Sequence, residues 1–120
     1  MSTRLLIVDD SRMSRLLLQG LVLQTHPGWT ILQASSGEEA LQLMQDQTAD
    51  LVSMDFNMHG MNGLEAALAL RKLRPGLPIA ILTANVQSAV QERIEEAGMV
   101  FIAKPITAQA VKQLAQLVGA

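Results

Sequence analysis

Short apolar runs recur along the chain and alternate with longer segments in which apolar and polar residues mix. The runs cover about residues 4–9, 29–34, 51–54, 79–82 and 99–102. Runs of this length, bounded by polar or turn residues, are typical of strands buried on both faces, as in parallel sheets. The run at 29–34 carries the polar residues Thr30 and Gln33, so we expect it at the edge of the sheet.

The segments between and after these runs show helical patterns. Helices are expected over about 11–24, from Ser35 and Ser36 to about 47, over 63–73, up to Gly98, and from Pro105 and Thr107 onward. Ser35 and Ser36 precede Glu38 and Glu39 by three residues, and Asn62 precedes Glu65 in the same way; this spacing is the capping-box signature. The side chains expected to face the core are Leu16, Leu17, Leu21 and Val22, then Val86, Val90 and Ile94, and finally Val111, Leu114, Leu117 and Val118.

Strand and helix alternate five times, without repeats, low-complexity tracts or linkers. This order predicts an α/β fold with a doubly wound parallel sheet and right-handed crossovers. A chain of 120 residues is close to the commonest domain size. We therefore expect one domain over residues 1–120.

Polar side chains follow four of the five predicted strands at the point where each strand ends. They are Asp9 and Asp10, Asp55, Thr83 and Lys104. The carboxyl ends of parallel strands share one edge, and ligands bind at that edge in open α/β sheets. Three carboxylates, a hydroxyl and an ammonium suit Mg²⁺ and a phosphoryl group. Taken singly, these residues have simpler interpretations: a helix-capping acidic pair, a solvated loop acid and a turn lysine.

The amino-acid composition excludes several classes of function. Hydrophobic residues make up 49% of the chain, but Trp29, Phe56 and Phe101 are its only aromatics. The absence of cysteine excludes disulfide and thiolate-metal chemistry. A net charge of −2 provides no basic patch, so direct nucleic-acid binding is not expected. We find no membrane-spanning run or signal segment and expect a soluble cytoplasmic protein.

With the aspartate pair, the single Asp55, Thr83, and Lys104 followed by Pro105, the chain resembles the receiver domain of two-component response regulators. Single-domain chemotaxis regulators are the most similar type, and the resemblance covers essentially all 120 residues. It implies a flavodoxin-like three-layer sandwich with strand order 2-1-3-4-5, an order for which the chemotaxis regulator is itself the reference example.

The resemblance also implies a role for each site residue. Asp55 would accept the phosphoryl group in a Mg²⁺-dependent reaction, with Mn²⁺ as an alternative ion and no organic cofactor. Asp9, Asp10, Asp55 and the backbone carbonyl of Asn57 would hold the metal, and Lys104 would pair with Asp55. Thr83 and the aromatic Phe101 would form the conformational switch. The Lys104–Pro105 peptide would be cis.

The chain departs from the family pattern at three positions. His59 stands where proline is common, and Asn62 stands where aspartate is common. We expect His59, like His26, to be a solvated residue without a partner at ligand spacing. Asn57 and Asn85 correspond to the positions that flank the hydrolytic water, and chemotaxis regulators often have an acid at the second. We therefore hypothesise an altered rate of self-dephosphorylation.

The expected partners are a sensor histidine kinase or phosphotransfer protein and a downstream protein target, bound by a monomer or weak dimer. The output face would be the fourth helix, fifth strand and fifth helix; we do not expect a turnover enzyme. The fourth helix has no lysine and is expected to expose Gln87, Ser88, Gln91, Glu92, Glu95 and Glu96. Whether the chain stands alone or is cut from a longer regulator stays open.

Three other functions fit the sequence less well. Haloacid-dehalogenase phosphatases use a Mg²⁺-dependent aspartyl nucleophile, but in a D-x-D pattern, whereas Asp9 and Asp10 are adjacent. A flavodoxin-type cofactor protein needs a glycine- and hydroxyl-rich phosphate loop after the first strand, where this chain has aspartates. An unphosphorylated pseudo-receiver acting as an interaction module is disfavoured because all five site residues are present.

Overall fold

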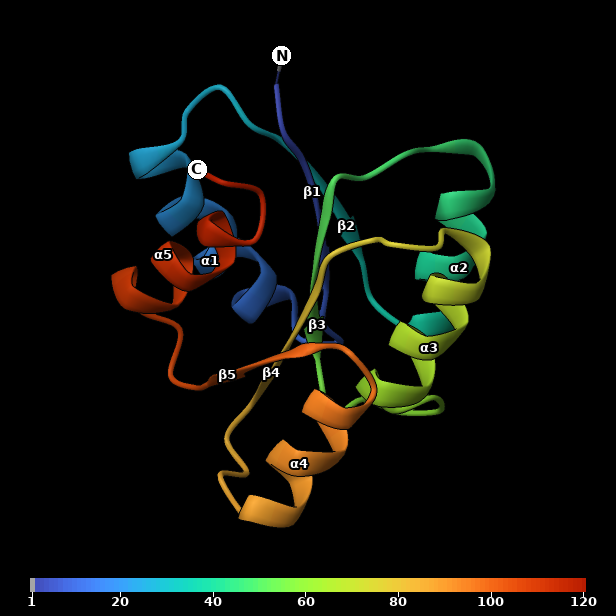
Figure 1. Ribbon diagram of the computed structural model, residues 1–120. Helices are drawn as coiled ribbons and strands as arrows, with labels where there is room; N and C mark the ends of the chain where they lie inside the picture. The colour runs from blue at the N-terminus through green and yellow to red at the C-terminus, as the bar shows by residue number, and fades with distance from the viewer. Residues whose placement is uncertain (1) are drawn as a thin grey trace.

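The computed structural model describes residues 2–120, in which five strands alternate with five helices (Figure 1). The predicted order of elements is therefore confirmed. The strands are β1 (Arg4–Val8), β2 (Thr30–Ala34), β3 (Leu51–Asp55), β4 (Ile79–Thr83) and β5 (Val100–Ala103). The helices are α1 (Arg12–Thr25), α2 (Gly37–Asp46), α3 (Gly63–Leu73), α4 (Ser88–Glu96) and α5 (Ala108–Gln116).

All four strand pairings in the sheet are parallel, and the order is β2-β1-β3-β4-β5, as expected. The register pairs Val8 with Met54 and Asp55 with Leu82. The last residues of β1, β3 and β4 consequently reach the same edge of the sheet. The polar strand β2 lies at one side of the sheet, which confirms its assignment as an edge strand.

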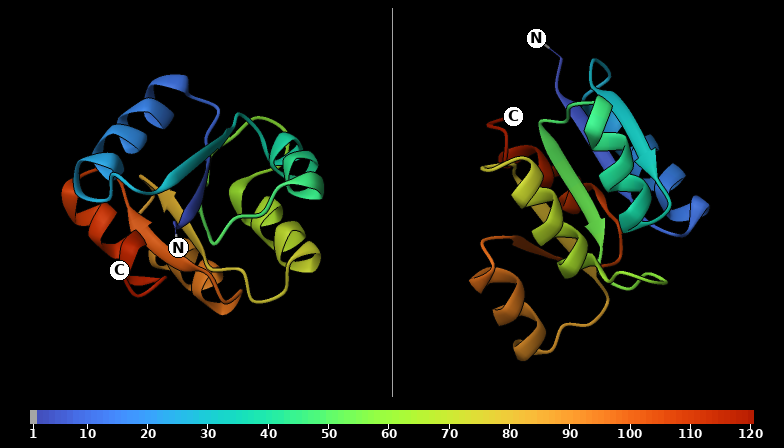
Figure 2. Two further views of the ribbon diagram at one scale, coloured as in Figure 1. Left: turned by 90° about the horizontal axis from the view of Figure 1, so that it is seen from above. Right: turned by 90° about the vertical axis from the view of Figure 1, so that its right-hand side faces the viewer.

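Helices cover both faces of the sheet: α1 and α5 lie on one face, and α2, α3 and α4 lie on the other (Figure 2). Alternate strand residues supply two separate apolar clusters, because successive side chains in a strand point to opposite faces. Leu5 and Ile7 pack with α1 and α5, whereas Leu6 and Val8 pack with the other three helices. Within residues 2–120, no helix is both long and apolar enough to cross a bilayer.

The expected inward face of α1 is confirmed for Val22 and in part for Leu21, but it is wrong for Leu16 and Leu17. Leu18 and Val22 are buried, at 2% and 0% exposure, whereas Leu16 and Leu17 are 45% and 51% exposed. Three consecutive leucines do not fix the phase of a helix, since neighbouring residues are about 100° apart. The sheet selects the pair spaced by four residues, Leu18 and Val22.

The expected role of Val86 in the fourth helix is also wrong. The helix begins at Ser88 after the N-cap Gln87, so Val86 lies outside it and is 64% exposed. The Asn85 Oδ1 atom accepts the Gln87 N–H at 3.1 Å, which forms a turn before the helix. Val90 and Ile94 are buried as predicted, and Gly98 adopts φ +83° just after the helix, the left-handed conformation usual at that position.

Helix capping largely follows the sequence signatures. Asn62 and Glu65 form the full reciprocal capping box at the start of α3. At the start of α2, Ser36 accepts the Glu39 N–H, but the Glu39 carboxylate accepts the N–H of Ser35 instead of that of Ser36. The two serines therefore share the capping function. Val111 and Leu114 of α5 are buried, whereas Leu117 and Val118, which follow the end of the helix at Gln116, are half-buried.

The observed phase of α1 predicts different effects for two neighbouring leucines. Leu18→Ala should lower the free energy of unfolding by about 2–5 kcal/mol, because it leaves a cavity against the sheet. Leu17→Ala, a control in the same helix, should change it by less than about 0.5 kcal/mol. Urea unfolding followed by circular dichroism measures both; equal losses would contradict this phase.

Candidate functional site

The ends of β1 and β3 bring three carboxylates together at one edge of the sheet. Asp9 and Asp10 follow β1 directly, and Asp55 is the last residue of β3, the neighbouring strand. One carboxylate oxygen from each residue lies within 4.8 Å of the other two. Asp9 and Asp55 are each 6% exposed, whereas Asp10 is exposed. The grouping expected from the sequence is therefore present.

Lys104 joins this group from the end of β5. Its Nζ atom lies 2.7 Å from Asp55 Oδ1 and 3.9 Å from Asp9 Oδ2. The Lys104–Pro105 peptide is cis, as expected. One ammonium faces three carboxylates, so the cluster has an excess of negative charge when all three are ionised.

Asp55 is the carboxyl whose pKa this arrangement shifts. Burial raises the pKa of the Asp55 carboxyl above its usual value, and the nearby Asp9 carboxylate raises it further. The hydrogen bond from Lys104 acts in the opposite direction but does not cancel the effect of burial. The ionised Asp55 is thus held where a cation or a proton would lower its energy.

Asp9 is fixed by two contacts with the start of α1. Its Oδ1 atom accepts the Ser11 N–H at 2.9 Å, and its backbone carbonyl accepts the Arg15 Nη1–H at 2.7 Å. The same guanidinium donates to Gln33 of β2. Our sequence reasoning missed Arg15. The available signal was a cation near a helix N-terminus, where the helix dipole disfavours positive charge and a specific partner is therefore needed.

The loop between β3 and α3 packs tightly against Asp55. The Gly63 N–H donates to the Phe56 carbonyl at 2.8 Å. A Cβ atom on Gly63 would lie 2.3 Å from the Asp55 carbonyl oxygen, so a larger residue would displace the backbone that carries Asp55. The loop and Asp10 line an open hollow of about 270 Å³ beside the carboxylates, formed by Asp10, Phe56, Asn57, Met58, His59 and Asn62.

His59 departs from the expectation of a residue without a partner. Its side chain is exposed, but its Nδ1 atom lies 3.1 Å from Asp10 Oδ2. Its backbone N–H approaches the same oxygen at 3.4 Å. The same expectation is wrong for His26, which is half-buried: its Nδ1 lies 2.9 Å from Thr25 Oγ1, and its ring centroid lies 4.6 Å from that of Trp29.

Thr83 and Phe101 lie close to the site in the sheet but are held by other contacts. Thr83 is fully buried, and its carbonyl accepts the Lys104 N–H at 3.0 Å. Its hydroxyl oxygen accepts the Asn85 N–H at 3.0 Å. Phe101 is half-buried in β5 beside Ile81 and packs on the cluster that includes α4. The structure thus links Thr83 to Lys104 through the backbone and to the start of α4 through Asn85.

The donor set suits a hard divalent ion. Mg²⁺ prefers oxygen ligands in an octahedron at about 2.1 Å, so opposite ligands lie about 4.2 Å apart. The three carboxylate oxygens already lie within 4.8 Å of one another, so only small shifts would bring them to that geometry. Asn57 lines the adjoining hollow, and coordination by its carbonyl stays a prediction.

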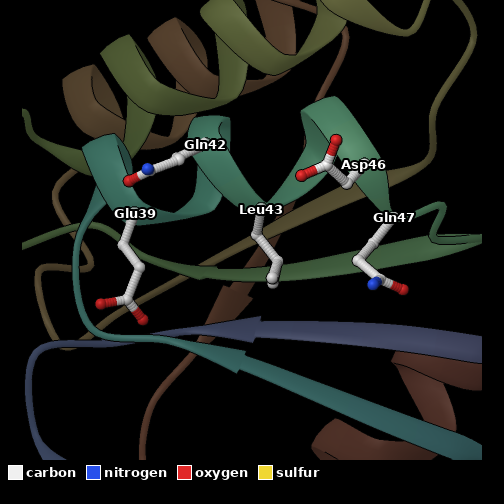
Figure 3. A pocket seen from close by; sticks show the side chains of 5 residues that line it. All are labelled: Glu39, Gln42, Leu43, Asp46 and Gln47. Carbon is white, nitrogen blue, oxygen red and sulfur yellow. The ribbon is translucent and has the colours of Figure 1, made fainter.

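A second hollow, of about 220 Å³, lies along α2 and is lined by Glu39, Gln42, Leu43, Asp46 and Gln47 (Figure 3). Glu39 is already bonded to Ser35 through both carboxylate oxygens. None of the strand-end residues lines this hollow, so the chemistry predicted from the sequence belongs to the carboxyl edge of the sheet.

The family model described as "Response regulator receiver domain" matches residues 5–116. The chain is 35% identical over 107 residues to the chemotaxis protein CheY of Thermotoga maritima, covering 88% of each protein. Other curated relatives are longer: the chain spans 24% of a transcriptional regulatory protein and 15% of a sensory/regulatory protein.

Solved structures give the same result. The chemotaxis protein CheY4 of Vibrio cholerae superposes with a TM-score of 0.87 at 25% identity, covering 97% of this chain and 98% of that one. The response regulator TrrA of Thermotoga maritima, in complex with Mg²⁺–BeF, gives 0.82 at 30% identity, with 96% and 98% covered. Both matches extend over nearly the whole chain.

The raised pKa of Asp55 predicts a stability effect in metal-free buffer. A carboxyl whose pKa is higher in the folded state makes the protein lose stability as the pH rises from the unfolded-state pKa through the folded-state pKa. At neutral pH, Asp55→Asn should therefore raise the free energy of unfolding by on the order of 1 kcal/mol, as measured by thermal or urea unfolding.

Asp46→Asn provides the control for that measurement, because Asp46 is exposed on α2 and its replacement should change stability by less than about 0.5 kcal/mol. Stability unchanged or lowered by Asp55→Asn would show that the Lys104 contact outweighs the burial of the carboxylate.

Proposed function

The chain belongs to the family of response regulator receiver domains, and from this premise we propose that it accepts a phosphoryl group on Asp55. The observation that carries the proposal is the position of the Asp55 carboxylate. It is buried at the end of β3, 2.7 Å from the Lys104 ammonium, and within 4.8 Å of two further carboxylates. A buried nucleophile beside a cation and a metal-binding group is the arrangement that phosphoryl transfer requires.

In the proposed reaction, an Asp55 carboxylate oxygen attacks the phosphorus of a phosphohistidine or a small acyl phosphate. An O–P bond forms, and the bond to the donor atom breaks, so that the donor leaves with the electron pair. The attack brings two negative groups together. Lys104 would offset this repulsion, since its ammonium already contacts Asp55 Oδ1 and can follow the charge to a phosphoryl oxygen.

Asp9, Asp10 and Asp55 would hold Mg²⁺, or Mn²⁺ as an alternative, with the Asn57 carbonyl as a further ligand. When bound, the ion supplies the positive charge that the cluster lacks. Asp9 would keep its orientation through Ser11 and Arg15. The donor set and the similarity to a regulator solved with Mg²⁺–BeF support this part of the proposal.

Thr83 and Phe101 would transmit the phosphorylated state. The Thr83 hydroxyl would leave the Asn85 N–H and donate to a phosphoryl oxygen, and the half-buried Phe101 ring would move into the space released. The readout would be the face formed by α4, β5 and α5. The signal would thus begin as one added charge at a strand end and become a repacking of a helix.

The proposed partners are a sensor histidine kinase or phosphotransfer protein and a downstream protein target. In this role the domain takes part in its own phosphorylation and dephosphorylation but does not turn over other substrates. Monomer or weak dimer as the oligomeric state and the cytoplasm as the location stay predictions. The alternatives are an interaction module that is never phosphorylated and an aspartyl phosphohydrolase.

Intact-mass spectrometry after incubation with acetyl phosphate and Mg²⁺ tests the phosphoacceptor. We expect a mass gain of one phosphoryl group in the wild type and in the exposed-site control Asp46→Asn. The gain should disappear in Asp55→Asn and after addition of EDTA. No gain, together with no binding of beryllofluoride, would favour the interaction module. Steady release of phosphate from many equivalents of donor would favour the phosphohydrolase.

The hydrogen bond between Asn85 and Gln87 suggests a matched pair of variants for testing the dephosphorylation rate. Asn85→Glu should change the rate of phosphoryl loss by a factor of roughly 3 to 10, equivalent to about 0.7–1.4 kcal/mol of barrier. Asn85→Asp is the matched variant, because a short carboxylate can still accept the Gln87 N–H. Time courses of the phosphorylated mass would measure both. Rates equal to wild type in both variants would exclude position 85 as a determinant of phosphoryl lifetime.

A further inference from the structure

We propose that His59 is a specificity-determining residue of the metal site and shifts its preference from Mg²⁺ toward borderline transition-metal ions such as Co²⁺ and Zn²⁺. The inference rests on the metal site of the proposed function. It concerns a side chain that the phosphoryl-transfer chemistry does not use. It begins from the contact between the His59 imidazole and the Asp10 carboxylate.

The distance between these two groups matches that of neighbouring metal ligands. His59 Nδ1 lies 3.1 Å from Asp10 Oδ2. Two atoms in adjacent positions of an octahedron with bonds of about 2.1 Å are about 3.0 Å apart. The imidazole therefore stands at ligand spacing from the most accessible of the three carboxylates. In the contact with the ionised Asp10, Nδ1 carries the proton, because a carboxylate oxygen only accepts. An ion held by Asp10 would take the place of that proton, with the imidazole in its Nε2–H tautomer.

The loop fixes the backbone of this residue but leaves its side chain free. The Gly63 N–H to Phe56 carbonyl bond and the Asn62–Glu65 capping box close the loop behind His59. The His59 side chain is 101% exposed, so it can turn toward an ion without losing packing. The hollow that it lines, of about 270 Å³, has room for an ion and several waters, since each water occupies roughly 30 Å³.

The imidazole nitrogen of His59 determines which metal ions the site would prefer. A neutral imidazole adds a donor atom without adding negative charge, so it does not strengthen binding of every cation equally. Mg²⁺ strongly prefers oxygen, whereas Co²⁺ and Zn²⁺ bind imidazole well. A proline at this position would supply neither the imidazole nor the backbone N–H that approaches Asp10.

Isothermal titration calorimetry with Mg²⁺ and with Co²⁺, both at the same pH, tests the proposal. His59→Ala should weaken Co²⁺ binding by about 10-fold, a typical loss for one supporting group at a metal site, and change Mg²⁺ binding by less than about 2-fold. His26→Ala is the control, because the chain has two histidines and His26 contacts Thr25 and Trp29 instead of the carboxylates. It should leave both affinities unchanged.

A spectroscopic measurement gives an independent readout of the bound nitrogen. With Mn²⁺ bound, electron spin-echo modulation should show coupling to an imidazole ¹⁴N in the wild type and in His26→Ala, but not in His59→Ala. Absence of this coupling in the wild type, or an unchanged Co²⁺ affinity in His59→Ala, would overturn the proposal. Equal losses of Mg²⁺ and Co²⁺ would also overturn it and show that His59 only orients Asp10.

These outcomes are separable from failure of the proposed function. If Mg²⁺ binds and Asp55 is phosphorylated, but His59→Ala leaves the metal preference unchanged, the inference about His59 fails alone. If the wild type binds neither ion, both proposals fail.

Discussion

Three carboxylates at one edge of the sheet, two of them in contact with a single ammonium, are the constraint on which the rest of this structure depends. Asp55 is almost fully buried, its nearest cation is Lys104, and the neighbouring Asp9 adds repulsion. A site built in this way is incompletely neutralised. It would gain stability from a bound cation, and in the proposed function the buried Asp55 carboxylate would accept a phosphoryl group. The same imbalance would lower the stability of the domain when no cation is bound, a cost that is common in preorganised sites.

The scaffold holds this group through main-chain contacts more than through side-chain packing. Asp9 is fixed through the Ser11 N–H and by Arg15 on its carbonyl, and the close approach of Gly63 fixes the backbone of Asp55. Lys104 follows a strand whose last residues pair with β4, and its N–H bonds to the Thr83 carbonyl. Rigid strands can hold such groups to within about 0.5 Å of a required geometry, a precision that flexible loops do not provide.

The connection from the site to α4 is a short chain of hydrogen bonds. The Thr83 hydroxyl accepts the Asn85 N–H, and the Asn85 side chain accepts the Gln87 N–H at the start of the helix. The N-cap Gln87 makes no side-chain capping bond, unlike the N-cap residues of the other four helices. In the proposed function, a change at Thr83 would therefore act on the one helix start within residues 2–120 whose N-cap side chain makes no capping bond.

The sequence by itself determined the alternating fold, the parallel sheet, the edge position of β2 and the set of strand-end residues. It could do so because apolar runs and capping residues are local signals. It could not determine the phase of α1, in which Leu18 and not Leu17 is buried, or the exclusion of Val86 from α4. Packing against the sheet and a turn at Asn85 decided those points. The contacts of Arg15 with Asp9 and of His59 with Asp10 could not be predicted either, because they join residues that come close together only once the chain is folded.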